Sequence, residues 1–151
     1  MKNQFKILGV VLFTIISLST YAQNTETRSL TSFDKLSIGI AAKVELTEGN
    51  SSSVKIEANG VELDKIETNI ENGKLRIHWR KGYRSWKRRK KVKLWITYRS
   101  LTKIGIGGSA SVIAKSVLKG NELSLSVSGS GNLTGKVDVT NLKTKISGSG
   151  S

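Results

Sequence analysis

The stretch Gly107-Gly108-Ser109-Ala110 recurs twice, as Ser128-Gly129-Ser130-Gly131 and as Ser147-Gly148-Ser149-Gly150. Each copy closes a run of alternating apolar residues, so one short strand is used three times with a period of about 20 residues. Such a period is typical of solenoids, in which each repeat forms one rung that stacks on the next. The repeats therefore predict an all-β fold that contains a parallel β-helix.

The glycines and serines of this phrase are predicted to form the corner of the solenoid. A sharp corner needs backbone angles that are open mainly to glycine, and small side chains let successive corners stack closely. We expect the serines to form a ladder of hydroxyl groups at roughly the 4.8 Å strand spacing. The predicted corner residues are Gly108, Ser109, Gly129, Ser130, Gly148 and Ser149.

The first 22 residues have the pattern of a signal peptide. Lys2 and Lys6 precede an apolar run from Ile7 to Leu18, and small residues lead to a cleavage position after Ala22. No later stretch is long or apolar enough to be a transmembrane helix, and the absence of cysteine excludes disulfides and a lipobox. We expect export through the Sec pathway to the periplasm, the cell surface or the medium, with residues 23–32 as a loose polar leader.

Antiparallel β-hairpins are predicted to precede the solenoid. From Phe33 onward apolar residues alternate with polar ones, as in half-buried strands. Asn72-Gly73 is a strong two-residue hairpin signal because both turn positions need positive φ. The run that ends at Trp79 and the run that begins at Val92 are expected to be two further hairpin arms, which makes residues 80–93 a basic hairpin flap within a domain spanning 33–151.

This basic segment, residues 80–93, carries most of the chain's excess charge. The formal net charge is +14, and the segment holds nine basic residues and no acidic one. Cations interleaved with aromatic rings suit polyanion binding, whereas a solvated loop without a partner is the alternative. The candidate polyanion-binding residues are Arg84, Trp86, Lys87, Arg88, Arg89, Lys90 and Lys91. An exported protein would meet acidic polysaccharide, lipopolysaccharide or extracellular nucleic acid as partners.

Other patterns in the chain do not predict catalytic, cofactor-binding or metal-binding residues. The run from Gly105 to Ala110 fits a dinucleotide fingerprint, but it recurs twice with strands after it, whereas a phosphate-binding turn needs a helix. His78 is the only histidine and is expected on an exposed face. Glu122 and Asp138 do not occupy matching positions in the repeats, so no stacked acidic cleft for glycan cleavage is indicated.

The assembled motifs resemble the auto-transporter adhesin head domain known as the GIN domain, found in exported proteins of the Bacteroidetes type. The resemblance covers most of the chain after residue 32 and is carried by Phe33-Asp34-Lys35-Leu36-Ser37-Ile38, Asn72-Gly73-Lys74-Leu75-Arg76-Ile77 and the glycine-serine rungs. It implies that the β-helix is right-handed and that the role is adhesion, without an established ligand or catalytic residues. Domains of this family usually run several rungs further, so the chain is expected to be incomplete at Ser151 and to self-associate through its open last rung.

These observations together predict a non-enzymatic binding or scaffold module that is exported or held at the cell surface. A binding module needs only an exposed, shaped face. The alternative is a polysaccharide-acting enzyme built on a β-helix, which needs ionisable groups that converge in a cleft.

Overall fold

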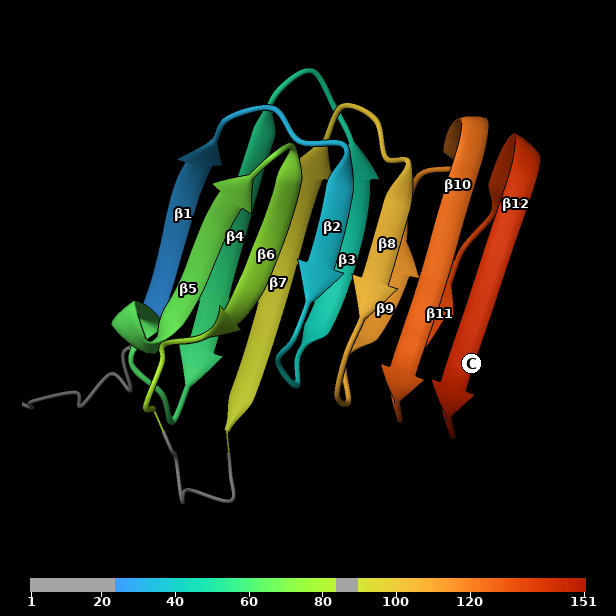
Figure 1. The fold of residues 1–151 in the computed structure, drawn as a ribbon. Helices are drawn as coiled ribbons and strands as arrows, with labels where there is room; N and C mark the ends of the chain where they lie inside the picture. Colours follow the sequence, from blue (N-terminus) through green and yellow to red (C-terminus); the bar gives the residue numbers. More distant parts are fainter. Residues whose placement is uncertain (1–23, 84–89) are drawn as a thin grey trace, which may run out of the picture.

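A computed structural model of the chain describes residues 24–83 and 90–151, and these residues form two six-stranded sheets that face each other (Figure 1). The described residues contain no α-helix, only a short 3-10 turn at Leu63–Lys65, so the all-β prediction is confirmed. None of their helical turns is long and apolar enough to cross a membrane. Both sheets are mixed, with parallel pairs in the majority.

We call the two layers sheet A and sheet B. Sheet A has the order β1 (Asn24–Leu30), β4 (Ser52–Asn59), β7 (Lys91–Tyr98), β3 (Lys43–Glu48), β9 (Ser111–Ala114) and β11 (Asn132–Thr134). Sheet B has the order β12 (Val137–Gly148), β10 (Leu118–Gly129), β8 (Lys103–Ile106), β2 (Lys35–Ile38), β6 (Lys74–Trp79) and β5 (Ile66–Glu71).

From β8 onward the chain passes back and forth between the two sheets. Strands β8, β10 and β12 lie side by side in sheet B in parallel register, while β9 and β11 pair in sheet A. The register places Ile106, Val127 and Ile146 in one column, as the repeats predict. The glycine-serine phrase is the point at which each passage leaves sheet B.

The middle glycines of the phrase adopt the left-handed conformation. Their φ angles are 71° at Gly108, 92° at Gly129 and 109° at Gly148. Crowding is greater at the second position, because a Cβ atom at Gly129 would lie 2.7 Å from the carbonyl oxygen of Gly108. Successive corners therefore stack closely enough to exclude a side chain. The serines beside them, Ser109, Ser130 and Ser149, are exposed.

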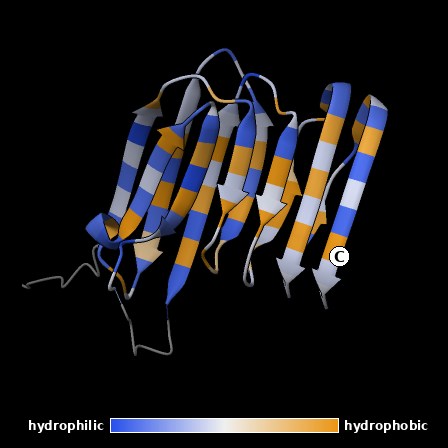
Figure 2. Ribbon diagram, viewed as in Figure 1, coloured by the Kyte–Doolittle hydropathy of each residue, from blue (hydrophilic) through white to orange (hydrophobic). Residues whose placement is uncertain are grey.

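The core lies between the sheets and is built by the alternation of each strand (Figure 2). Leu36 and Ile38 of β2 face Leu46 of β3 and Ile56 of β4 across the interior, and all four are at most 1 % exposed. Full burial of such a side chain stabilises the fold by about 1.5 to 3 kcal/mol relative to exposure. The polar residues between them, such as Lys35 and Ser37, therefore lie on the outer faces.

The spatial order of the strand pairs differs from their order in sequence. The early pair β2–β3 lies between β6–β7 on one side and β8–β9 on the other, in both sheets. Asp34 fixes this arrangement at the start of β2. Its backbone N–H donates to the carbonyl of Gly73 at 3.0 Å, and its carboxylate accepts a hydrogen bond from Thr102 Oγ1 at 3.0 Å.

The polar leader expected at the N-terminal end is in part a strand. Residues 24–30 of the expected polar leader form strand β1, which pairs with β4 along its whole length. Thr25 and Thr27 are β-branched, and Leu30 packs against the core, which explains why a polar stretch can serve as an edge strand. The antiparallel prediction is confirmed for β5–β6, where Asn72 and Gly73 both have positive φ in the turn, but it is wrong for β2 and β3, which pair in parallel with all their neighbours.

The expected hairpin across the basic segment is wrong. Strand β6 lies in sheet B, beside β5 and β2, whereas β7 lies in sheet A, beside β4 and β3. The alternation in the two runs is the same whether they pair with each other or with other strands, so the pattern could not separate these outcomes. The chain therefore passes from sheet B to sheet A between β6 and β7, and these two strands do not form a hairpin.

Strand β12 ends sheet B with part of its core-facing side uncovered. Leu142 is 50 % exposed and Ile146 is 57 % exposed, although their partners on β10, Leu123 and Val127, are buried. The apolar columns of the interior thus continue to β12, where no further strand of the described chain packs on them.

Candidate polyanion-binding site

The basic segment begins with a tight turn at the end of β6. The N–H of Tyr83 donates to the carbonyl of Arg80 at 2.9 Å, and Gly82 has a φ of 80°. Positive φ at the third position is the requirement of a type II turn, which glycine meets without strain. The N–H of Arg80 donates to Lys65 at 2.8 Å, so the turn is tied to the neighbouring loop.

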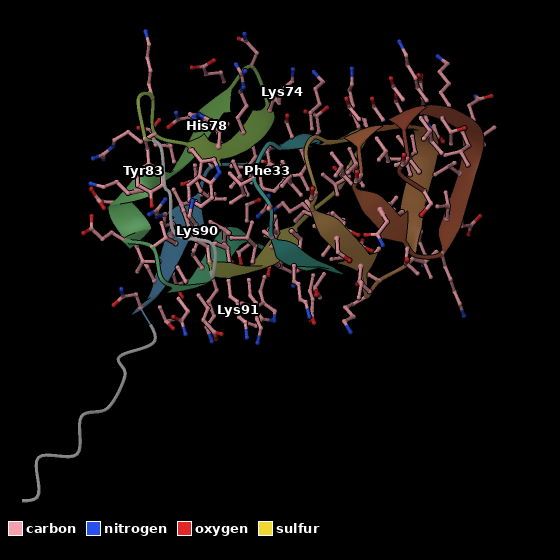
Figure 3. All side chains as sticks on the ribbon, turned by 90° about the horizontal axis from the view of Figure 1, so that it is seen from below. Phe33, Lys74, His78, Tyr83, Lys90 and Lys91 are labelled. Carbon is pink, nitrogen blue, oxygen red and sulfur yellow. The ribbon has the colours of Figure 1, made fainter. Side chains whose placement is uncertain are left out.

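A cluster of two rings and one cation brings the two ends of the segment together. The rings of Trp79 and Tyr83 lie 5.5 Å apart at an angle of 41°. Lys90 Nζ lies 5.3 Å from the centroid of Trp79 and 5.5 Å from that of Tyr83. Cation–π contacts at such distances are worth roughly 0.5 to 1 kcal/mol at exposed sites. The cluster therefore holds residue 90 against the turn that begins the segment (Figure 3).

Carboxylates neutralise basic residues at both borders of the segment. Arg80 forms ion pairs with Asp64 at 3.0 Å and with Glu67 at 3.4 Å. At the other border, Lys93 of β7 lies 3.6 Å from Glu57 of β4. The hydrogen bond from Lys65, with Arg80 as a lesser neighbour, lowers the pKa of Asp64 below its usual value. Sequence reasoning missed these partners because they lie on other strands, and only the charge balance could have hinted at them.

The predicted polyanion-binding residues divide into two groups. Arg84, Trp86, Lys87, Arg88 and Arg89 lie outside the described residues. Lys90 is half-buried in the ring cluster, and Lys91 is exposed at the start of β7. Trp95 does not join the cluster, because it lies on the outer face of sheet A, where Lys55 Nζ is 5.2 Å from its ring.

The other candidate groups lie apart from this site. His78 lies on the outer face of sheet B, where its ring contacts Asn69 at 3.3 Å and Glu67 at 3.8 Å. Glu122 accepts a hydrogen bond from Lys143 at 2.9 Å, which lowers the pKa of its carboxyl group. Asp138 lies on the neighbouring strand opposite Lys119, so it does not share a row with Glu122. Within the described ranges no three side chains are grouped as metal ligands.

Shallow hollows surround Arg99 at one end of sheet A. One has a volume of about 360 Å³ and is lined mainly by serines, including Ser52, whose buried hydroxyl has no hydrogen-bond partner among the described atoms. The buried hydroxyl of Tyr98, in the strand before Arg99, also has no such partner. Arg99 donates from Nε to the carbonyl of Asn50 at 2.8 Å.

The chain belongs to the family described as "Putative auto-transporter adhesin, head GIN domain", whose model matches residues 32–151. The two-sheet fold and the resemblance of the sequence motifs therefore lead to the same family. No curated protein matches the chain.

Several solved structures share the fold. A putative adhesin from Parabacteroides distasonis is 16 % identical with a TM-score of 0.74, and the match covers 85 % of this chain and 54 % of that one. A putative adhesin from Parabacteroides merdae is 18 % identical with a TM-score of 0.72, covering 84 % and 53 %. A putative lipid binding protein from P. distasonis is 18 % identical with a TM-score of 0.62, covering 82 % and 63 %. The chain thus spans about half the length of the two adhesins, and at these identities the likeness extends to the fold alone.

Proposed function

We propose that the chain is a non-enzymatic, exported adhesion module of the GIN family that binds anionic polymers through its basic segment. Strands β8 to β12 would form right-handed β-helix rungs. The domain, with its basic segment, would lie outside the cytoplasm. The observation that supports the proposal best is the cluster of Trp79, Tyr83 and Lys90, which closes the base of a segment rich in cations. Within the segment, residues 84–91 hold six basic residues and no carboxylate.

Charge neutralisation is the expected mode of binding. Each basic residue that contacts a phosphate on duplex DNA releases counterions, which adds about −0.9 to the slope of log affinity against log salt. Changing Lys87, Arg88 and Arg89 to Gln should therefore flatten this slope by about 2.7 on duplex DNA and weaken binding to a sulfated polysaccharide in parallel. Lys90 is left unchanged so that the ring cluster stays intact.

A charge-matched variant controls for net charge. Changing Lys115, Lys119 and Lys136 to Gln removes the same three charges from exposed positions in the C-terminal half. Salt-series titrations of both variants should show a flattened slope for the first alone. The proposal is lost if the two variants behave alike or if the parent chain binds no anionic polymer at low salt.

A further substitution separates the classes of polyanion. If the ring of Trp86 stacks on bases, changing Trp86 to Ala should weaken the binding of single-stranded DNA by about 1 to 3 kcal/mol. The binding of a sulfated glycan should change little. Export is tested separately by mass spectrometry of the protein from the producing cell, which should have lost residues 1–22. Turnover of an acidic glycan that disappears in Glu122→Gln or Asp138→Asn would favour an enzyme instead.

A further inference from the structure

The outer face of sheet B carries a row of lysines that runs across the strands. Lys74 of β6 is the register partner of Lys35 on β2, and Lys35 is in turn the partner of Lys103 on β8. The row continues through Ser124 on β10 to Lys143 on β12. Neighbouring positions are separated by one strand spacing, about 4.8 Å. We call Lys35, Lys74 and Lys103 the lysine row.

These lysines point away from the core. Each one precedes a fully buried residue in its strand, namely Leu36, Leu75 and Ile104. Side chains alternate between the two faces of a strand, so the row lies on the outer surface. Figure 3 shows Lys74 on the outer side of its sheet, whereas Lys91 lies on the opposite side of the molecule, with Phe33 between them.

Like charges directly opposite each other destabilise a sheet, so the row is a cost to the fold. Elsewhere the sheets place opposite charges across strands, as in Lys93 with Glu57 and Lys143 with Glu122. The three lysines of the row take part in none of the ion pairs formed among the described residues. A feature that breaks a local rule without a compensating contact is a candidate for function.

The row of residues next to the lysine row has mostly small side chains. The next row along the strands begins with Arg76 and continues through Ser37, Gly105 and Ser126 to Lys145. Its three middle residues have small side chains or none, while the lysine row beside them has long ones. The lysine side chains therefore stand higher than the neighbouring row, and this difference in height forms a step across the strands. Cations lie along one side of the step and at both ends. We call its lower level, formed by Ser37, Gly105 and Ser126, the serine floor.

We propose that this face binds a linear anionic polysaccharide that lies across the strands, with its acidic groups on the lysine row and its hydroxyl groups over the serine floor. An extended sugar polymer suits a surface that continues across several neighbouring strands. Neither row contains an aromatic residue, whereas binding of single-stranded nucleic acid relies on rings for base stacking. The surface is separate from the basic segment and does not depend on it.

Carboxylates limit the length of the site. Glu71 of β5 is the register partner of Lys74, and Glu122 pairs with Lys143 at 2.9 Å. The row is thus flanked by negative charge at both ends, and the uncompensated part is the three central lysines. A bound polymer should therefore place two or three acidic groups on this face.

Changing Lys35, Lys74 and Lys103 to Gln tests the proposal. The probe is polygalacturonate, a linear polysaccharide with one carboxylate per sugar, titrated against the whole chain at several salt concentrations. Because each exposed ion pair contributes modestly and three are removed, affinity at low salt should fall on the order of tenfold or more. Glutamine keeps the first half of the aliphatic stem and a polar end, and removal of repulsion should leave the melting temperature unchanged or raised.

Matched variants keep the result interpretable. The triple change to Arg should retain binding, and the equal charge loss at Lys115, Lys119 and Lys136 should have a much smaller effect. The Gln change at residues 87–89 should leave the lysine-row contribution intact, so failure of the basic-segment proposal is distinguishable from failure of this one. Equal losses in the lysine-row and control variants would overturn the proposal. The proposal would also be overturned if the lysine-row Gln variant lost binding to duplex DNA or to anionic vesicles but kept its binding to polygalacturonate.

Discussion

Tyr98 shows how one buried side chain makes stability depend on pH. Its ring is 2 % exposed and its hydroxyl group has no partner among the described atoms. Burial, with a smaller contribution from the negative charge of Glu48, raises the pKa of this hydroxyl above its usual value near 10. The folded state therefore keeps the proton at a pH at which the unfolded chain has already lost it.

Tyr98→Phe should remove this dependence. In the parent chain the contribution is fully present below about pH 10 and is lost as pH rises from there toward the raised pKa of the folded state. The variant should match the parent at pH 7 to within about 1 kcal/mol, because no hydrogen bond is lost. Urea unfolding at pH 7 and at alkaline pH measures the difference. A variant that is strongly destabilised at pH 7 would show that the hydroxyl has a partner.

Alanine substitutions at Gly108 and Gly129 should separate the cost of backbone strain from the cost of steric crowding. Both have positive φ, so alanine at either position should cost about 1 to 2 kcal/mol from backbone strain. A Cβ at Gly108 meets no atom within 4 Å, whereas at Gly129 it would lie 2.7 Å from a backbone oxygen. Gly129→Ala should therefore lose a further 1 to 3 kcal/mol, roughly the cost of overpacking. Equal losses in urea unfolding would contradict the close stacking of the corners.

At the scale of the elements, the exposed side of β12 is expected to drive self-association. Two copies can pair their open edges and so cover Leu142 and Ile146. This pairing removes apolar surface from water. Ile146→Lys places a charge on this side, whereas Ser147→Lys places the same charge on the opposite side of the strand. Sedimentation over a concentration series should show weaker association for the first variant. A parent chain that stays monomeric at high concentration would refute the expectation.

The sequence predicted those elements whose neighbours follow directly in the chain. The period of the glycine-serine phrase was enough for β8, β10 and β12, and Asn72-Gly73 for the β5–β6 turn. The register partner of β8 on its other side was missed, although Ile38-Gly39 and Val44 of the early strands match Ile106-Gly107 and Val112 of the later ones. The lysine row was missed for the same reason, because its members become neighbours only through this long-range pairing.

At the scale of the whole molecule, Lys91, where the basic segment joins β7, and Lys74 of the lysine row lie on opposite sides, with the core between them (Figure 3). A module with two such faces should cross-link an anionic polymer that offers many sites. Light scattering against the protein-to-polysaccharide ratio should pass through a maximum for the parent chain. Variants that have lost one face should still bind but should scatter little, and full scattering by both would argue against bridging.

The position of β2–β3 between later strands has a consequence for the order of folding. Asp34 and Thr102, which are bonded to each other, lie 68 residues apart, and the strands that they begin cannot meet until most of the chain is available. Synthesis delivers the N-terminal strands first, so they must wait without partners for the segments that will enclose them. Contacts of this separation make folding slow. The repeats that follow can then add in sequence to β8, so β2 waits long for its last partner, whereas β10 and β12 meet theirs soon after they are made.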